Sequence, residues 1–152
     1  MIQRIQSVYL LLAGLVLAFS FCTPLVNYYN ADNTAAGVMF ATSILGTDGV
    51  AISHPYGVLT ITLVSAVLSF VIIFLFKNRR LQIKLANILL LLILLLYVAI
   101  IAYSLAFNAK HDTTMSGTYG AVMPLVAYIL GWLGRRGIRK DEELVRSAER
   151  FR

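Results

Sequence analysis

Charge is missing from the long apolar stretches of this sequence. Four stretches, at about residues 7–26, 56–76, 85–107 and 119–133, contain no Asp, Glu, Lys, Arg or His. Ionisable residues inside membrane helices mark proton relays, ion pathways and counter-ions. Their absence argues against a proton- or ion-coupled transporter, and it removes the usual acid–base groups from the interior.

Cysteine is almost absent as well. Cys22 is the only one, so no internal disulfide can form. The bulky Phe21 stands before it where lipoprotein processing needs a small residue, which argues against a lipid anchor. We expect Cys22 to be a small buried side chain, as free cysteines usually are. The opening Met1–Gln6 resembles a signal-peptide n-region, but no A-x-A-like cleavage site follows, which indicates an uncleaved first span.

Catalytic groups are scarce throughout. His54 and His111 are the only histidines, and the His111-Asp112 pair falls short of the three or four ligands that zinc needs. No nucleophile elbow, P-loop or HExxH motif is present. We therefore predict no catalytic, cofactor-binding or metal-binding residue and no enzyme. Nucleic-acid binding is also disfavoured, because the basic residues flank apolar stretches and are not interleaved with aromatics.

Apolar residues make up 59% of the 152 residues, and the mean hydropathy is +0.80. A membrane span needs about 20 apolar residues; the first three stretches reach that length, and the fourth is short and is expected to depend on the rest of the bundle. The third contains an unbroken run of Leu and Ile over Leu89–Leu96 and is the strongest span. The fourth carries Gly120, Pro124 and Gly131, which membrane helices tolerate when neighbouring helices supply packing.

The positive charge is distributed unevenly between the two sides of these spans. Of the 13 Lys and Arg residues, all but Lys110 precede the first span, separate the second from the third, or follow the fourth. Because positive residues near span ends stay in the cytoplasm, both termini are expected inside. We therefore predict an all-α membrane protein, with a four-transmembrane-helix bundle over residues 1–137 (N-in/C-in) as one membrane domain.

Two segments outside the spans show their own patterns. Residues 37–45 are rich in β-branched and apolar residues, residues 46–49 are turn-like, and residues 50–53 can return as a partner strand, which predicts a small outer β-hairpin. Residues 138–152 place apolar side chains at helical spacing, which predicts a cytoplasmic C-terminal amphipathic helix. Such a helix with basic residues can lie on an anionic leaflet or dock on a partner.

Small and hydroxylic residues recur at helical spacing within the spans, which favours close helix packing. The predicted packing residues are Gly14, Ala18, Thr62, Ser65, Ser69, Ala127 and Gly131. An alternative interpretation is a small transporter or channel with a neutral polar pathway lined by Thr62, Ser65, Ser69 and Tyr97. Tyr28 and Trp132 fall near opposite span ends, where aromatic residues anchor membrane proteins.

Three segments of the chain resemble the DUF4293 family of small four-span membrane proteins of Bacteroidota: Met1–Leu10, Lys77–Lys84 and Lys140–Arg152. The resemblance implies the same topology and a bacterial inner-membrane location, and it implies no activity.

The leading hypothesis is a non-enzymatic accessory or scaffold protein without a cofactor. It would use its basic cytoplasmic face to bind a partner protein, in the inner membrane or the cytoplasm, or anionic lipid headgroups of the bilayer. The candidate binding residues are Lys77, Arg79, Arg80, Lys84, Arg135, Arg136, Arg139, Lys140, Arg146 and Arg150.

Overall fold

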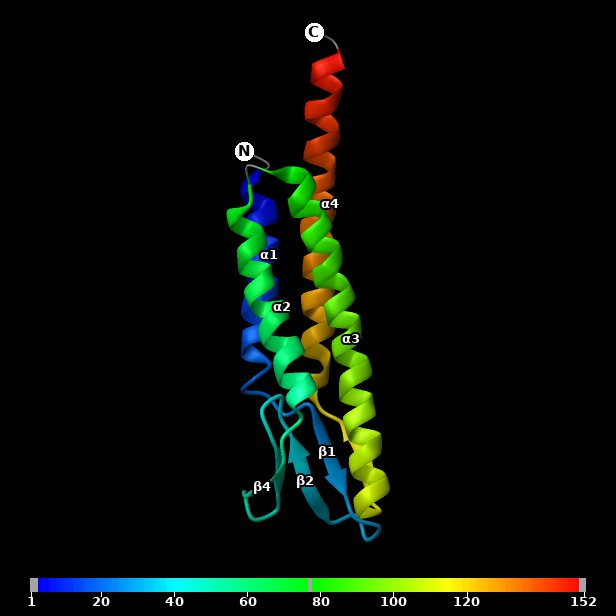
Figure 1. Cartoon of the computed structure of the whole chain (residues 1–152). Coiled ribbons are helices and arrows are strands. Elements are labelled where there is room, and N and C mark those ends of the chain that lie inside the picture. Colours follow the sequence, from blue (N-terminus) through cyan, green and yellow to red (C-terminus); the bar gives the residue numbers. More distant parts are fainter. Residues whose placement is uncertain (1–2, 77, 151–152) are drawn as a thin grey trace.

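Four helices run side by side, with a small sheet at one end of the bundle (Figure 1). The computed structural model describes residues 3–76 and 78–150, with side chains except at 3–4, 145–146 and 148–150. The predicted, mainly helical architecture is confirmed. The helices are α1 (Gln3–Phe19), α2 (Tyr56–Phe74), α3 (Arg79–His111) and α4 (Met123–Arg150), with a short 3-10 helix, η1 (Tyr119–Val122), before α4.

The four helices differ in length and composition. Within the described ranges, α2 and α3 are long and apolar enough to cross a membrane. The helix α1 is a shorter apolar helix over Ile5–Phe19. The first half of α4 is apolar and its second half, from Arg135, is charged. Residues 138–150, expected as a separate tail, continue α4 without a break.

The first apolar stretch leaves the helical conformation earlier than predicted. α1 ends at Phe19, where the prediction extended the span to Val26. The Ser20 hydroxyl donates to a carbonyl of the last helical turn at 2.6 Å, and Thr23 precedes a proline, a position that disfavours helix. Cys22 lies in the turn between helix and sheet and is exposed, so the prediction of a buried cysteine is wrong.

The sheet is larger than the predicted hairpin. It has five antiparallel strands in the order β4-β3-β2-β1-β5. The strands are β1 (Val26–Tyr29), β2 (Ala35–Met39), β3 (Ile44–Gly46), β4 (Ala51–Ser53) and β5 (Thr114–Gly117).

The two halves of the hairpin prediction have different outcomes. The hairpin through residues 46–49 is confirmed, since β3 pairs with β4 there. The prediction of one strand over 37–45 is wrong. A tight turn, in which the Phe40 N–H donates to the Ser43 carbonyl at 2.8 Å, divides this segment into β2 and β3.

The last two turns of α3 pack on the sheet. Tyr28 of β1 is fully buried there, with its ring 4.5 Å from the Phe107 ring. The Tyr28 hydroxyl donates to Ser104 Oγ at 3.2 Å. Tyr28 is therefore a core residue, and its predicted place in an aromatic belt is wrong. Burial raises the pKa of Tyr28, and the hydrogen bond with Ser104 offsets part of that rise.

Small residues lie at close contacts between helices at several of the predicted positions. A Cβ atom at Gly14 would lie 3.1 Å from the Phe70 ring, so α1 and α2 approach closely there. The hydroxyl of Ser69 donates across the same interface to the Leu10 carbonyl at 2.6 Å. On α4, Ala127 is fully buried, and Gly131 faces α3, where a Cβ atom would lie 3.3 Å from the Leu90 side chain. Ala18 is exposed and takes no part in this packing.

Candidate functional site at the charged end of the bundle

The basic segments of the sequence meet at one end of the bundle, which we call the charged end. It holds the beginning of α1, the connection between α2 and α3, and the second half of α4, and both chain ends lie there (Figure 1). The sheet and Lys110 occupy the opposite end, the sheet end. The uneven charge distribution along the sequence therefore corresponds to two different ends of the molecule.

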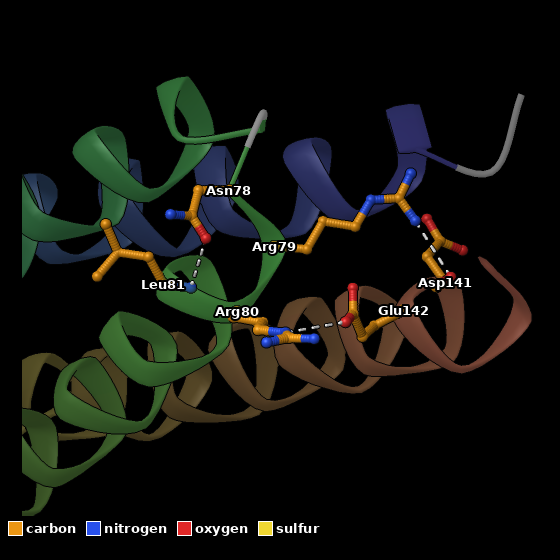
Figure 2. A network of polar contacts seen from close by, with 6 residues as sticks. All are labelled: Asn78, Arg79, Arg80, Leu81, Asp141 and Glu142. Carbon is orange, nitrogen blue, oxygen red and sulfur yellow. Dashed lines mark hydrogen bonds and ion pairs between the residues drawn. The ribbon is translucent and has the colours of Figure 1, made fainter. Parts of the chain in front are cut away.

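Asp141 is the centre of the charged end. It lies in the second half of α4 and is only 7% exposed. Its Oδ2 accepts a 2.6 Å hydrogen bond from the Gln6 side-chain amide of α1. Its backbone carbonyl accepts a 3.1 Å hydrogen bond from Arg79 Nη1 at the start of α3 (Figure 2). One residue of α4 therefore joins α1 and α3.

The connection between α2 and α3 is held by two further side-chain amides. The Asn78 side chain caps α3 by accepting from the Leu81 N–H at 3.2 Å (Figure 2). The Gln82 amide, 7% exposed, donates to the Ile72 carbonyl in the last turn of α2 at 3.0 Å. The same carbonyl also accepts from the Leu75 N–H at 3.3 Å, so the end of α2 is held by a backbone donor and by a side-chain donor. The turn is thus fixed by hydrogen bonds, and it positions Arg79 and Arg80.

A cavity of about 440 Å³ opens beside this cluster. It lies between the starts of α1 and α3, the end of α2 and the second half of α4. Its polar walls are formed by Gln6, Ser7, Arg79, Gln82 and Asp141. Its apolar walls are formed by Ile73, Phe74, Phe76 and Ile138. Gln6 and Arg79 bond to Asp141 across helices, and Gln82 bonds to the end of α2. The cavity therefore belongs to the junction of α1, α2, α3 and α4 that closes this end.

Ion pairs on the outer surface of the charged end are weak. Arg80 Nε lies 3.7 Å from Glu142 Oε1, with the Arg80 side chain 80% exposed (Figure 2). Arg139 Nε donates to Glu143 Oε1 at 3.2 Å along α4, and both side chains are largely exposed. Exposed pairs of this kind contribute roughly 0.2–1 kcal/mol. They orient side chains and add little to stability.

A second cluster lies on α4 between Trp132 and Arg139, in the turns that precede Asp141. The Arg136 guanidinium carbon lies 5.6 Å from the centroid of the Trp132 ring, a cation–π arrangement. A hollow of about 180 Å³ is lined by Trp132, Arg135, Arg136 and Arg139. Within the described part of the chain, the buried Nε of Arg135 has no hydrogen-bond partner. This cluster brings three guanidinium groups together within five residues of α4.

A comparison with family models shows to which family this chain belongs. A model described as "Domain of unknown function (DUF4293)" matches residues 2–151. The chain belongs to the DUF4293 family. The resemblance inferred from the three basic segments is thereby confirmed over nearly the whole length. A search of curated proteins gives no match for this chain.

The structure brings most of the predicted binding residues of this DUF4293 protein to the charged end, in different environments. Arg79 and Arg135 are partly buried, whereas Arg80, Lys84, Arg136, Arg139 and Lys140 are exposed. Lys77 lies outside the described residues, and so do the side chains of Arg146 and Arg150. The predicted residues therefore do not form one surface: Arg79 faces the junction, and Arg135, Arg136 and Arg139 form the cluster on α4.

Three residues of the junction were not among the predicted site residues. Gln6, Gln82 and Asp141 are each 7% exposed and hydrogen-bonded across helices. In the sequence they stand next to basic residues and look like ordinary residues that flank a span. The signal that could have pointed to them was an uncharged side-chain amide in each of the first two basic segments, Gln6 and Gln82, and a carboxylate, Asp141, in the third.

The hydroxyl groups proposed for a polar pathway all donate hydrogen bonds to backbone carbonyl groups in this DUF4293 protein. Thr62 and Ser65 donate to carbonyls of their own helix at 2.7 Å, and Ser69 donates to α1. The Tyr97 hydroxyl donates to the Ala121 carbonyl at 2.7 Å. Among the described residues, no group of three or more His, Cys, Asp or Glu is placed to hold a metal ion.

Proposed function

We propose that this DUF4293 protein is a four-span protein of the bacterial inner membrane, with the charged end in the cytoplasm. We propose further that it is a non-enzymatic accessory or scaffold protein, which binds a partner protein through the projecting end of α4. The membrane location, the topology and the partner are three separate parts of this proposal, and each has its own support.

The distribution of side chains between inside and outside supports the membrane location. Large apolar residues point outward from every helix; Leu15, Val67, Leu91 and Ile129 are about half exposed or more. Small polar residues lie inside instead, and Ser65 and Ser69 are fully buried. Membrane bundles show this arrangement, because lipid covers the outside and small residues allow close helix contact. In water the same outer surface would be a large unfavourable apolar area.

The short helix α1 fits this location as part of the bundle. The 17 residues of α1 extend roughly 26 Å at ~1.5 Å per residue, slightly less than the ~30 Å hydrocarbon core. The helix α1 packs between α2 and α4, and α3 likewise packs against α2 and α4. A short helix that is held on two sides tolerates a small mismatch, because the bilayer thins locally at modest cost.

The basic residues support the topology. The described Lys and Arg residues lie at the charged end except Lys110, as the positive-inside rule expects for a cytoplasmic face. In this orientation the sheet, with the exposed Cys22 beside it, lies on the opposite side of the membrane.

A cysteine-labelling experiment tests the topology. Cys22 is the only native cysteine, so a membrane-impermeant maleimide should label it in spheroplasts without lysis. In a Cys22→Ser background, Ser147→Cys, at an exposed position of α4, should react only after lysis. The opposite labelling pattern would overturn the proposed orientation. If neither site is labelled after lysis, both cysteines are inaccessible to the reagent, and labelling in denaturant then shows that they can react.

The scaffold role is carried by one observation, the projection of α4 beyond the bundle (Figure 1). The contacts of Arg79 with Asp141 and of Arg80 with Glu142 lie near the level at which α1 and α3 begin and α2 ends. Beyond it, α4 continues to Arg150, and the described side chains Glu143, Leu144 and Ser147 are exposed. A helix that projects from a rigid base is a suitable docking element for another protein.

A truncation tests the scaffold role. A chain that ends at Glu143 keeps the contacts of Asp141 and Glu142, so the bundle should remain intact. The full chain with Leu144→Gln is the matched variant, since it keeps every charge of the projecting segment. Crosslinking in cells followed by purification should show a protein that is recovered with the full chain and lost with the truncation. If both forms recover the same proteins, the projecting end of α4 has no docking role.

The alternative function, a transporter or channel with a neutral pathway, gains no support from the bundle interior. The hydroxyls that would line the pathway bond to carbonyl groups, and the fully buried Leu89 and Ile93 fill the space between the helices. We therefore favour the scaffold role.

A further inference from the structure

The exposed side of α4 changes its chemistry at Trp132. Before it, Leu125 and Ile129 are each 49% exposed, and Trp132 itself is 42% exposed. After it, the same side of the helix carries Arg136 and Arg139, because these positions follow at helical spacing. An apolar stripe that ends in a Trp and then in arginines is typical of the level at which lipid tails meet headgroups.

The hollow at this level is built for an anion. Its lining consists of Trp132 and three arginines, with a volume of about 180 Å³. Arg135 lines the hollow with a partly buried side chain, and its buried Nε has no hydrogen-bond partner among the described residues. Arg136 is held over the Trp132 ring, which restricts its guanidinium group. A guanidinium that is positioned in advance loses less entropy when it binds a phosphate.

The neighbouring carboxylates leave the hollow positively charged. Glu143 pairs with Arg139 at 3.2 Å and offsets one of the three positive charges. The Asp141 side chain bonds to Gln6 of α1, and Glu142 pairs with the exposed Arg80 of α3. Arg135 and Arg136 form none of the described ion pairs. Two guanidinium groups therefore remain available to an incoming anion.

We infer that Trp132, Arg135, Arg136 and Arg139 form a binding site for the phosphate of an anionic phospholipid in the cytoplasmic leaflet. This inference rests on the proposed membrane placement. The phosphate accepts hydrogen bonds from the guanidinium groups, and the acyl chains lie along Leu125 and Ile129. The apolar stripe beside the hollow favours a lipid over a free phosphate ion, because only a lipid uses both parts of the surface. Basic clusters at the cytoplasmic end of a span bind anionic headgroups in this way.

The test uses the full chain, purified in mild detergent and titrated with phosphatidylglycerol or phosphatidylcholine while native mass spectrometry counts bound lipids. Wild type should prefer phosphatidylglycerol. The double variant Arg135→Gln/Arg136→Gln should bind it at least about tenfold more weakly, since each basic residue near an anionic headgroup contributes about a factor of five. The matched control is Arg80→Gln/Lys84→Gln, which removes the same charge from α3 at the same end and should stay within about twofold of wild type.

Three results would overturn the inference. Equal loss in both double variants would mean general attraction by the basic end. No loss in either would mean that the lipid binds elsewhere. Displacement of phosphatidylglycerol by equimolar inorganic phosphate would mean a site for free anions. The single variant Arg136→Gln, at an exposed position, keeps the test valid if the double variant unfolds, and a smaller weakening is expected. Labelling of Cys22 from the wrong side would refute the proposed topology independently of this binding measurement.

Discussion

The amide of Gln6 donates a 2.6 Å hydrogen bond to the carboxylate of Asp141, and 135 positions of the chain separate the two residues. Both side chains are only 7% exposed, so the bond is largely shielded from water. A charge-assisted bond in such a place is stronger than one between neutral groups. It closes the bundle between α1 and α4 at the charged end, and it sets the direction in which α4 leaves the bundle.

Asp141→Ala should destabilise the protein by about 1–3 kcal/mol, because the buried amide of Gln6 then loses its acceptor. Thermal unfolding in detergent, followed by circular dichroism, measures the effect. Glu143→Ala is the control, since that carboxylate is about two-thirds exposed and pairs only along its own helix. A similar shift in both variants would show that Asp141 does not secure this end.

Gly137→Ala should weaken the same junction without removing any of its polar groups. A Cβ atom at Gly137 would lie 2.6 Å from Gln6 Cγ, so the Gln6 side chain must move away from Asp141. We expect a destabilisation of roughly 1–3 kcal/mol, typical of overpacking. Gly131→Ala is the matched control on the same helix, because its nearest neighbour is the flexible end of Leu90 at 3.3 Å. Equal stability of the two variants would contradict the prediction.

The helices and their charged end could be predicted from the sequence, because apolar length and basic flanks are local signals. The sheet could be predicted only in part. Val26 of β1 is the last residue of the first apolar stretch and pairs with Gly117 of β5, which lies in a short connection far along the chain. Neither segment shows a strand pattern by itself, and pairing over such a distance leaves no local mark in composition.

The site shows the same division between local and distant signals. The basic residues at Arg79 and Arg135 stand out by charge, so they were among the candidates. Their functions differ because of what lies beside them: Arg79 bonds to α4, whereas Arg135 has a buried Nε without a described partner. The difference depends on helix packing, which one-dimensional charge patterns do not contain.

Gly120→Ala should destabilise the fold more than either of the variants at the charged end. A Cβ atom at Gly120 would overlap the Pro24 carbonyl oxygen, which is backbone and cannot rotate away. η1 must therefore separate from the turn that links α1 to β1, with an expected cost of at least about 3 kcal/mol. The unfolding temperature and the yield of monodisperse protein measure this. Gly117→Ala, with open space around its Cβ position, should behave like wild type; a stable Gly120→Ala variant would show that the turn can shift.

Tyr28→Phe should separate the hydrogen bond of Tyr28 from its packing. The ring contact with Phe107 remains, and the bond to Ser104 is lost, so we expect about 1 kcal/mol of destabilisation at neutral pH. The effect should depend on pH in one direction. Because burial raises the pKa of Tyr28 in the folded protein, the unfolded chain loses this proton first. The stabilisation by Tyr28 is therefore complete below about pH 10, the ordinary tyrosine pKa, and is lost as the pH rises through the higher folded-state pKa.

The measurement is the free energy of unfolding of wild type and Tyr28→Phe between pH 7 and pH 11 in the same detergent. Wild type should lose stability above about pH 10 more steeply than the variant, so the two curves approach each other and the advantage of wild type disappears. Tyr56→Phe is the control, since Tyr56 is 65% exposed. Parallel curves for wild type and Tyr28→Phe would mean that the hydroxyl of Tyr28 ionises as easily in the folded protein as in the unfolded chain, and that the contact between β1 and α3 does not shield it.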